Sequence, residues 1–209
     1  LRAEVGDFTV RQFVTRGPGE WSRDAGPPTV CISVAGVSYD RFARFLKSGA
    51  HGVIARTRSY SADSVDPKIK HYSRMNFNMA DIEAGDVDPE SWPILTDSDG
   101  NLSEGTGYNF FMVTNGVIRT PGDQSILQGV SRMAVFDLAQ QLGIPVVEEE
   151  LQPYDLYTAD EAFFSGTSYF VLPMTKVDNR IVSDGKPGPI TQQLMAALSE
   201  SVGVDLVDQ

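Results

Sequence analysis

LSEGTGYNFFMVTNGVIR, residues 102–119, is the stretch of sequence that decides the fold. Two apolar runs, Asn109–Thr114 and Val117–Arg119, flank the dipeptide Asn115-Gly116. Both residues of this dipeptide tolerate a positive φ, which a tight turn between two antiparallel strands requires. We therefore expect a β-hairpin in the middle of the chain, preceded by a glycine-rich turn that carries Glu104.

Strands and helices surround this hairpin without regular alternation. Apolar and β-branched runs predict further strands at Phe8–Thr15, Thr29–Val34, Gly52–Thr57, Trp92–Thr96, Pro145–Glu150, Phe163–Ser165 and Phe170–Met174. Helical spacing predicts helices at Tyr39–Leu46, at 73–84 with an end at Gly85, after residues 127–131 as far as Leu142, at Asp155–Asp160, and from Pro189 to about Val202. This mixture indicates an α+β fold rather than a doubly wound parallel sheet.

Composition and charge argue against several classes of function. The formal net charge of -11 opposes binding to nucleic acid and to anionic membrane surfaces. No apolar run reaches the length of a membrane span. Cys31 is the only cysteine, which rules out an intrachain disulfide and fits a reducing cytoplasm. His51 and His71 lack metal-ligand spacing, so we expect no metal site.

Five lysines are candidates for a reactive amine. Lys47 ends a predicted helix, where a cation suits the helix dipole, and Lys176 and Lys186 lie in predicted turns. Lys68 and Lys70 remain, in the segment VDPKIK, and strand-like alternation would place both on one face. A desolvated lysine could form a Schiff base and carry a proton, although most lysines are solvated surface charges. The local pattern does not choose between the two.

Three further segments could contact a ligand, and each also has a simpler structural explanation. The turn 104–107 lets the backbone approach a ligand while Glu104 projects from it, or it is only a polar loop. The helix start LQGVSR, residues 127–132, offers free N–H groups to a phosphate, or is only a helix capped by Ser131. The hydroxyl-rich turn 165–168 could grip a phosphate or a carboxylate, or be only a turn. Taken singly, these segments favour the structural explanations.

Taken together and in order, the segments resemble one family. The segments that carry the resemblance are VDPKIK at 65–70, the turn with Glu104, Arg119-Thr120-Pro121, LQGVSR at 127–132, the turn 165–168, and Gly188-Pro189-Ile190-Thr191. They resemble the class IV, or fold-type IV, aminotransferases, which include branched-chain aminotransferases, D-amino-acid transaminases, (R)-selective amine transaminases and aminodeoxychorismate lyase. The resemblance runs from about Phe8 to the C-terminus and is densest from Val65 to Pro189. No nucleophile elbow, phosphate loop or dinucleotide-binding glycine motif competes with it.

The resemblance implies a D-amino-acid aminotransferase-like α+β fold. Residues 1–58 would be a remnant of the small N-terminal α/β domain with the interdomain region, and residues 59–209 the large domain that binds pyridoxal 5'-phosphate. Family members begin with the small domain, which supplies a phosphate-binding arginine and one wall of the substrate pocket. Only its last third is expected here, and the chain opens on Leu1. We therefore expect an N-terminally truncated chain with impaired or absent turnover.

The resemblance also implies roles for individual residues toward the cofactor. Lys70 corresponds to the lysine that carries pyridoxal phosphate as a Schiff base and moves a proton between the substrate α-carbon and the cofactor, which selects it over Lys68. Glu104 corresponds to the carboxylate that keeps the pyridine nitrogen protonated, so that the ring accepts carbanion electrons. The other expected cofactor-binding residues pack on the ring or hold the phosphate: Leu127, Gly129, Val130, Ser131 and Thr167.

The expected substrate-binding residues are Thr167, Ser168, Arg11 and Arg23. The backbone of Thr167 and Ser168 would face the substrate carboxylate. Arg11 lines up with an arginine that branched-chain enzymes use near that carboxylate. Arg23 is either a mobile carboxylate-binding arginine, as in amine and D-amino-acid transaminases, or a solvated loop charge. The departures from the usual pattern are Thr9 in place of an aromatic residue, Met75 in place of a tyrosine and Ser131 in place of a threonine.

The implied activity is transamination through pyridoxamine phosphate by a cytoplasmic homodimer. Its partners would be an amino acid or amine as donor and a 2-oxo acid as acceptor, in the manner of a branched-chain aminotransferase. Two alternatives stay open. One is a lyase of the aminodeoxychorismate type, which would use the same Lys70, and the other is a catalytically impaired or cofactor-free fragment.

Overall fold

The computed structural model describes residues 7–19 and 26–207. Its contacts divide the chain into two compact units, Leu1–Arg41 and Phe42–Gln209. This division comes before the predicted one after residue 58, because strand β3 (Ala50–Ile54) pairs with strands of the larger unit. The interpretation of residues 1–58 as a remnant domain stays a prediction.

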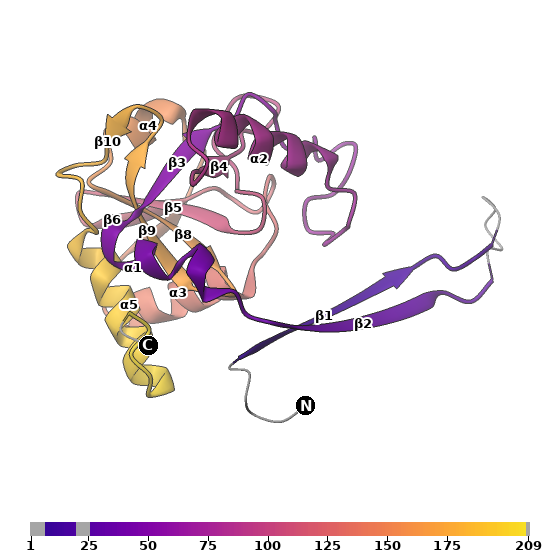
Figure 1. Ribbon diagram of the computed structural model, residues 1–209. Helices are drawn as coiled ribbons and strands as arrows, with labels where there is room; N and C mark the ends of the chain where they lie inside the picture. The colour runs from indigo at the N-terminus through magenta and orange to yellow at the C-terminus, as the bar shows by residue number, and fades with distance from the viewer. Residues whose placement is uncertain (1–6, 20–25, 208–209) are drawn as a thin grey trace. The chain divides into compact units, whose positions relative to one another are not determined.

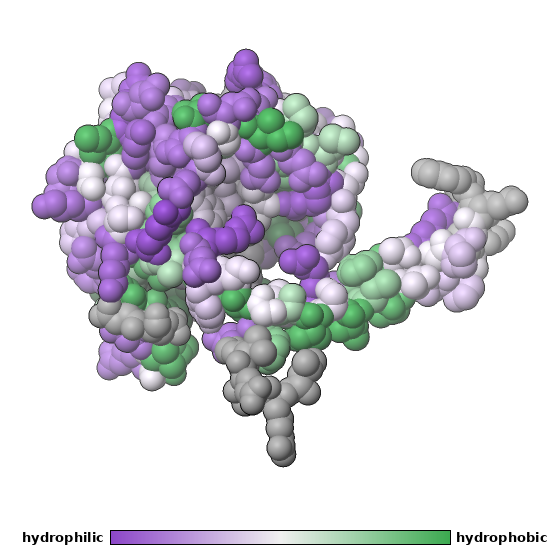
Figure 2. Space-filling model, in the orientation of Figure 1, coloured by the Kyte–Doolittle hydropathy of each residue, from purple (hydrophilic) through white to green (hydrophobic). Residues whose placement is uncertain are grey.

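The smaller unit is a β-hairpin of β1 (Phe8–Thr15) and β2 (Thr29–Gly36), followed by a 3-10 turn at Tyr39–Arg41. Both predicted strands are confirmed, and β2 extends two residues further than expected. Directly paired residues of antiparallel strands project from the same face, so Val10 lies beside Val34 on an apolar face. These valines are exposed, and the apolar residues of the hairpin stand out in green in Figure 2.

The larger unit is built on a mixed sheet with the strand order β4-β3-β9-β8-β5-β6-β7, and β10 pairs with β9 (Figure 1). Besides β3, the strands are β4 (Trp92–Ile94), β5 (Asn109–Thr114), β6 (Val117–Thr120), β7 (Val146–Glu148), β8 (Glu161–Gly166), β9 (Phe170–Val177) and β10 (Arg180–Ile181). The β5–β6 hairpin turns at Asn115 and Gly116, with φ of 52° and 79°. The predicted hairpin is therefore confirmed.

The centre of this sheet is buried on both faces. Side chains from β5 and β8, among them Phe110, Phe111, Phe163 and Phe164, have no exposed surface. The rings of Phe111 and Phe163 stack with their centroids 4.9 Å apart. Helices α3 (Val130–Gln141) and α5 (Pro189–Val202) both contact β8, while α1 (Ala43–Ser48) contacts β9 and α2 (Met75–Val87) contacts β3 and β4. The uninterrupted apolar runs of β5 and β8 therefore fill the core.

Several element boundaries differ from the sequence-based expectation. The expected helix Tyr39–Leu46 is split between the 3-10 turn and α1, which ends at Gly49. Helix α2 does not end at Gly85 but continues to Val87, and Ala80 and Ala84 are fully buried on its packed face. The short helix predicted at Asp155–Asp160 is α4 (Pro153–Tyr157).

Within residues 7–19 and 26–207, no helix is long and apolar enough to cross a bilayer.

Glu161 of β8 connects the sheet to the start of α5. This buried carboxylate accepts hydrogen bonds from the N–H groups of Ile190 at 2.9 Å and Thr191 at 2.8 Å, and from the Thr191 hydroxyl at 2.7 Å. A Cβ atom added to Gly188 would lie 2.1 Å from the Glu161 side chain. The carboxylate satisfies free N–H groups of the helix and complements its dipole, which explains a buried acid in a central strand.

We expect Glu161→Gln to lower the free energy of unfolding by roughly 2 kcal/mol, because one side-chain oxygen becomes an NH2 group that faces backbone donors. Urea denaturation followed by circular dichroism measures this loss. Glu200→Gln, on the exposed surface of the same helix, serves as the control and should change stability little. Equal stability of the two variants would contradict the capping role.

Candidate functional site

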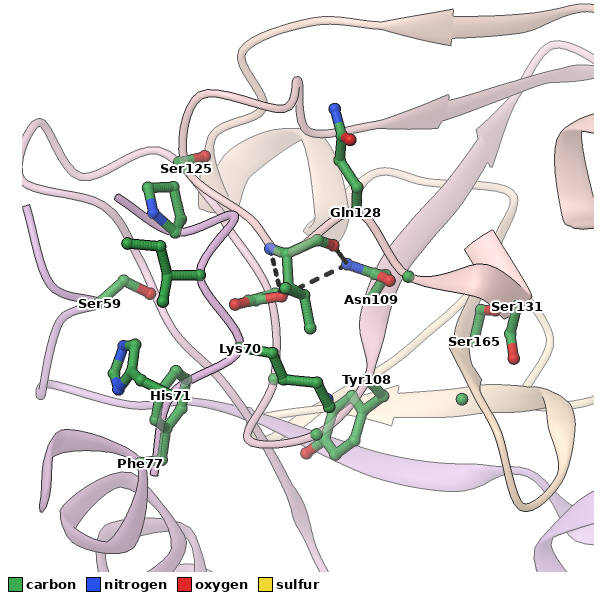
Figure 3. Close-up of a pocket in the computed structure, with 18 of the residues that line it drawn as sticks. Ser59, Lys70, His71, Phe77, Tyr108, Asn109, Ser125, Gln128, Ser131 and Ser165 are labelled. Atoms are coloured by element: carbon green, nitrogen blue, oxygen red, sulfur yellow. Dashed lines mark hydrogen bonds between the residues drawn. The ribbon is translucent and has the colours of Figure 1, made fainter. Parts of the chain in front are cut away.

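A cavity of about 240 Å³ lies in the larger unit where four segments distant in sequence meet. Its walls come from residues within 59–77, 104–109, 125–131 and 165–167 (Figure 3). These ranges contain the segments that the sequence singles out for ligand contact. The fold therefore brings the predicted segments together around one space.

All of the expected cofactor-binding residues line this cavity, namely Lys70, Glu104, Leu127, Gly129, Val130, Ser131 and Thr167. The expected substrate-binding residues are more dispersed. Ser168 is exposed and is not among the lining residues, Arg11 is exposed on β1 of the smaller unit, and Arg23 lies outside the described residues. The roles of all these residues stay predictions.

The structure separates Lys70 from Lys68. Residues 66–70 form turns rather than a strand: the Asp66 carboxylate accepts the N–H of Lys68 at 2.9 Å, and the Asp66 carbonyl accepts the N–H of Ile69 at 3.0 Å. The Lys68 ammonium lies 3.8 Å from the same carboxylate, whereas Lys70 lies on the cavity wall (Figure 3). The expectation that alternation places both lysines on one face is therefore wrong. Lys70 is exposed rather than desolvated.

Glu104 is a buried carboxylate at the side of the cavity. Its Oε2 atom accepts the N–H of Leu127 at 3.0 Å and the amide of Asn109 at 3.4 Å. Burial raises the pKa of Glu104 to about 7, although the Leu127 hydrogen bond and the nearby charges of Arg74 and Lys70 act in the opposite direction. This acid is therefore poised to ionise near neutral pH and to stabilise a cation placed beside it.

Tight packing keeps the Glu104 turn and the helix start in place. Asn109 donates to the Leu127 carbonyl at 2.8 Å and also pairs with Glu104 through a β-bridge. A Cβ atom at Gly129 would lie 2.3 Å from the Asn109 side-chain oxygen, and one at Gly105 would lie 1.8 Å from the Tyr108 ring. Only glycine fits at these two positions without displacing a neighbour.

The N-terminus of α3 forms another part of the wall. Gly129 is the N-cap residue and no side chain within the described ranges caps the helix, so the alternative of a helix capped by Ser131 is wrong. The first N–H groups of an α-helix have no partner within the helix, and they lie at the positive end of its dipole. Because Val130 and Ser131 line the cavity, this end suits an anion.

Arg74 is a cavity residue that the sequence reasoning missed. Its guanidinium donates to the carbonyl of Thr106 and lies 3.9 Å from the centre of the Phe77 ring. This contact ties the segment that carries Lys70 to the turn that carries Glu104. A basic residue at the start of α2 opposes the helix dipole, and this local conflict was the signal available in the sequence.

Two other lining residues bear buried polar atoms without a hydrogen-bond partner among the described residues. They are the Ser165 hydroxyl and the Nδ1 atom of His71. The sequence offered only a weak signal for Ser165, its place in the hydroxyl-rich turn, and His71 was noted there only for its lack of metal-ligand spacing. Unsatisfied polar atoms that line a cavity point to a missing ligand or water.

Comparison with known proteins decides the family. A model of the class IV amino-transferase family matches residues 2–177. This chain is a class IV aminotransferase-family protein. The resemblance found in the sequence and the expected α+β, fold-type IV architecture are thereby confirmed.

Individual relatives agree with this assignment. A protein of Methanocaldococcus jannaschii named "Putative branched-chain-amino-acid aminotransferase" is 37% identical over 194 residues, which are 90% of this chain and 65% of that protein. The Escherichia coli branched-chain amino acid aminotransferase has a TM-score of 0.78 at 26% identity over 94% of this chain and 63% of that one. The Thermoproteus uzoniensis branched-chain aminotransferase, solved with norvaline, has a TM-score of 0.80 at 28% identity over 94% and 65%. This class IV chain thus spans about 65% of the length of such relatives.

We expect the stability of the ligand-free chain to fall as the pH rises from about 4.5 to 7. In this window the unfolded chain has lost the Glu104 proton while the folded chain still holds it. The raised pKa of Glu104 therefore lowers the free energy of unfolding by up to about 3 kcal/mol across this range. Chemical denaturation at pH 4.5, 6 and 7.5 measures the free energy of unfolding.

The control for this titration is Glu104→Gln, compared with Glu200→Gln on the exposed surface of α5. The first variant should remove this part of the pH dependence and the second should retain it. If both variants follow the wild-type pH profile, the raised pKa of Glu104 is contradicted.

Proposed function

We propose that this chain binds pyridoxal 5'-phosphate and transfers an amino group from an amino acid or amine to a 2-oxo acid. The observation that carries the proposal is the meeting of three groups in one cavity of a class IV aminotransferase-family fold: an accessible amine at Lys70, a buried carboxylate at Glu104 and the N-terminus of α3. Because the chain is shorter than its relatives, the activity of the whole enzyme is inferred from this site.

The residues present fit the chemical groups of this cofactor. Glu104 is a buried acid with a pKa of about 7, and a protonated pyridine nitrogen beside it would supply the cation that its ionised form lacks. Leu127, from the same segment as the α3 start, anchors this carboxylate. The free N–H groups at Val130 and Ser131 and the unpartnered Ser165 hydroxyl are donors suited to a phosphate.

When bound, pyridoxal phosphate supplies a ring that withdraws the electron pair of a breaking bond at the substrate α-carbon. Glu104 would keep the ring nitrogen protonated, and the Lys70 amine would hold the cofactor. When it is not bonded to the cofactor, the Lys70 amine would accept the α-proton of the substrate and return it. Lys68 is unsuited to these tasks, because it lies beside Asp66 and outside the cavity wall.

We propose an apolar amino acid as the donor. Tyr60, Val65, Ile69 and Phe77 line the cavity beside Lys70 and present an apolar wall. Solved relatives are named branched-chain aminotransferases, and one of them was solved with norvaline. Thr167 is proposed as a phosphate contact, and Arg11, Arg23 and the Thr167-Ser168 backbone as contacts of the substrate carboxylate.

A homodimer and a cytoplasmic location complete the proposal. The homodimer rests on the family, whose members work as dimers with the site near the interface, and the cytoplasmic location rests on the single cysteine, Cys31.

We expect the purified chain to acquire visible absorbance after incubation with pyridoxal phosphate and removal of the free cofactor. Borohydride should bleach this absorbance and leave the added mass on the peptide that contains Lys70. Lys70→Ala should lose both signals and roughly 100-fold or more of any transamination rate.

Lys68→Ala is the matched control, because Lys68 lies two residues away outside the cavity wall. It should keep the absorbance and the modified peptide. A wild-type chain that stays colourless after incubation would contradict cofactor binding, and would favour a cofactor-free fragment.

Dependence on an amino acceptor separates transamination from the lyase alternative. With an apolar amino donor alone, we expect about one 2-oxo acid product per site, because the amino group stays on the protein-bound cofactor. Continued turnover should require an added 2-oxo acid, and turnover without one would favour a lyase. A full-length class IV relative assayed in parallel should turn over faster, and equal rates would contradict the expected impairment of this chain.

A further inference from the structure

Helix α2 bears apolar side chains on two opposite faces. The face that packs on the sheet carries three buried residues, Phe77, Ala80 and Ala84. The opposite face carries Met75, Met79 and Ile82, which are 70%, 42% and 58% exposed. Their spacing of four and then three residues places them in one stripe along the helix. A helix that is apolar all round is normally covered on both sides, so this stripe indicates a contact with another molecule.

The stripe is separate from the ligand cavity. Met75, Met79 and Ile82 are not among the residues that line the cavity, whereas Phe77, on the other face of the helix, is one of them. Figure 1 shows α2 along the outside of the larger unit. A ligand in the cavity would therefore leave the stripe uncovered, and a macromolecular partner is needed to bury it.

The charges beside the stripe are divided between its two ends. Residues 68–74, which lead into the helix, contain Lys68, Lys70 and Arg74 and no acid. Residues 81–90 contain no base and five acids, namely Asp81, Glu83, Asp86, Asp88 and Glu90. Four of these acids accept hydrogen bonds from groups of their own chain, whereas Asp86 is exposed and continues the stripe one turn beyond Ile82. The exposed face therefore runs from a positive end to a negative end.

A second copy of this chain fits such a face. A two-fold axis perpendicular to α2 brings the same surface of both copies together and makes the two helices antiparallel. The two apolar stripes then meet, and the positive end of each helix lies beside the negative end of the other. A parallel arrangement would instead place like charges side by side, which is unfavourable. Both the apolar stripe and the charges are therefore self-complementary in the antiparallel arrangement.

We infer that two copies of this chain associate through the exposed face of α2, with the helices antiparallel and Met79 near the two-fold axis. Met79 is the middle residue of the stripe, so the two copies of Met79 meet, while Met75 of each copy lies near Ile82 of the other. The inference rests on the proposed homodimer and gives it a contact surface. Because Phe77 lines the cavity from the same helix, this contact would also hold one wall of the site in place.

The test measures the self-association of the ligand-free full chain by analytical ultracentrifugation. Wild type should be a dimer at micromolar concentration. Met79→Glu and Met79→Lys should each weaken the association by roughly 100-fold or more, because like charges then meet at the axis in place of two apolar side chains. An equimolar mixture of the two variants should form a dimer again, because opposite charges then face each other. Such recovery also shows that both variants are folded.

Two control variants place a charge on other exposed apolar positions. Met133→Glu changes a methionine of α3 that is 51% exposed, and Ile32→Glu changes the apolar face of the β1–β2 hairpin. Both should stay dimeric. If Ile32→Glu dissociates the dimer and Met79→Glu does not, the hairpin is the interface and the inference is wrong, although the proposed homodimer stands.

Two other results would overturn the inference. One is a dimer that persists in Met79→Glu, and the other is a mixture of the two Met79 variants that stays monomeric. If wild type itself is monomeric, the inference fails together with the proposed homodimer. The visible absorbance that depends on Lys70 then still decides separately whether the chain binds pyridoxal phosphate.

Discussion

The hydrogen bond from the Leu127 N–H to the buried Glu104 carboxylate joins two segments that are distant in sequence. A buried carboxylate is unfavourable unless polar groups satisfy it. The turn that carries Glu104 must therefore lie against the segment that leads into α3, where Leu127 supplies its N–H. Asn109 reinforces the junction, because its amide donates to both Glu104 and the Leu127 carbonyl. The position of the α3 N-terminus relative to the acid follows from this contact.

Strand pairing in the central sheet also fixes the position of the Glu104 turn relative to β8. Asn109 begins β5 and pairs directly with Ser165 at the far end of β8. Asn109 therefore connects the acid to the hydroxyl, because it forms a β-bridge with Glu104 and pairs with Ser165 in the β5–β8 ladder. The stacked rings of Phe111 and Phe163 bury the same strand pair further along. A site built on such a ladder holds its groups in place before any ligand binds.

The segment with Lys70 is attached differently. Residues 61–70 form turns and contribute no strand, and Lys70 is exposed. The link between Arg74 and the Thr106 carbonyl connects this segment to the rigid part of the site. An exposed amine beside a buried acid and an anion site suits a lysine that must both hold a ligand and exchange protons with it. Lys70 and Glu104 differ in this way because Lys70 lies in a segment of turns, whereas Glu104 is hydrogen-bonded to the segment that leads into α3.

Sequence alone determined the features that depend on near neighbours and on motif order. The Asn115-Gly116 hairpin, most strands and helices, and the family were all predictable, because turn chemistry and periodicity act over a few residues. Tertiary structure decided the rest. It placed Lys70, but not Lys68, on the wall of a cavity formed by distant segments, carried α2 past Gly85, and left the buried Ser165 hydroxyl without a partner among the described residues. These outcomes depend on burial and on partners far away in the chain, which no local pattern records.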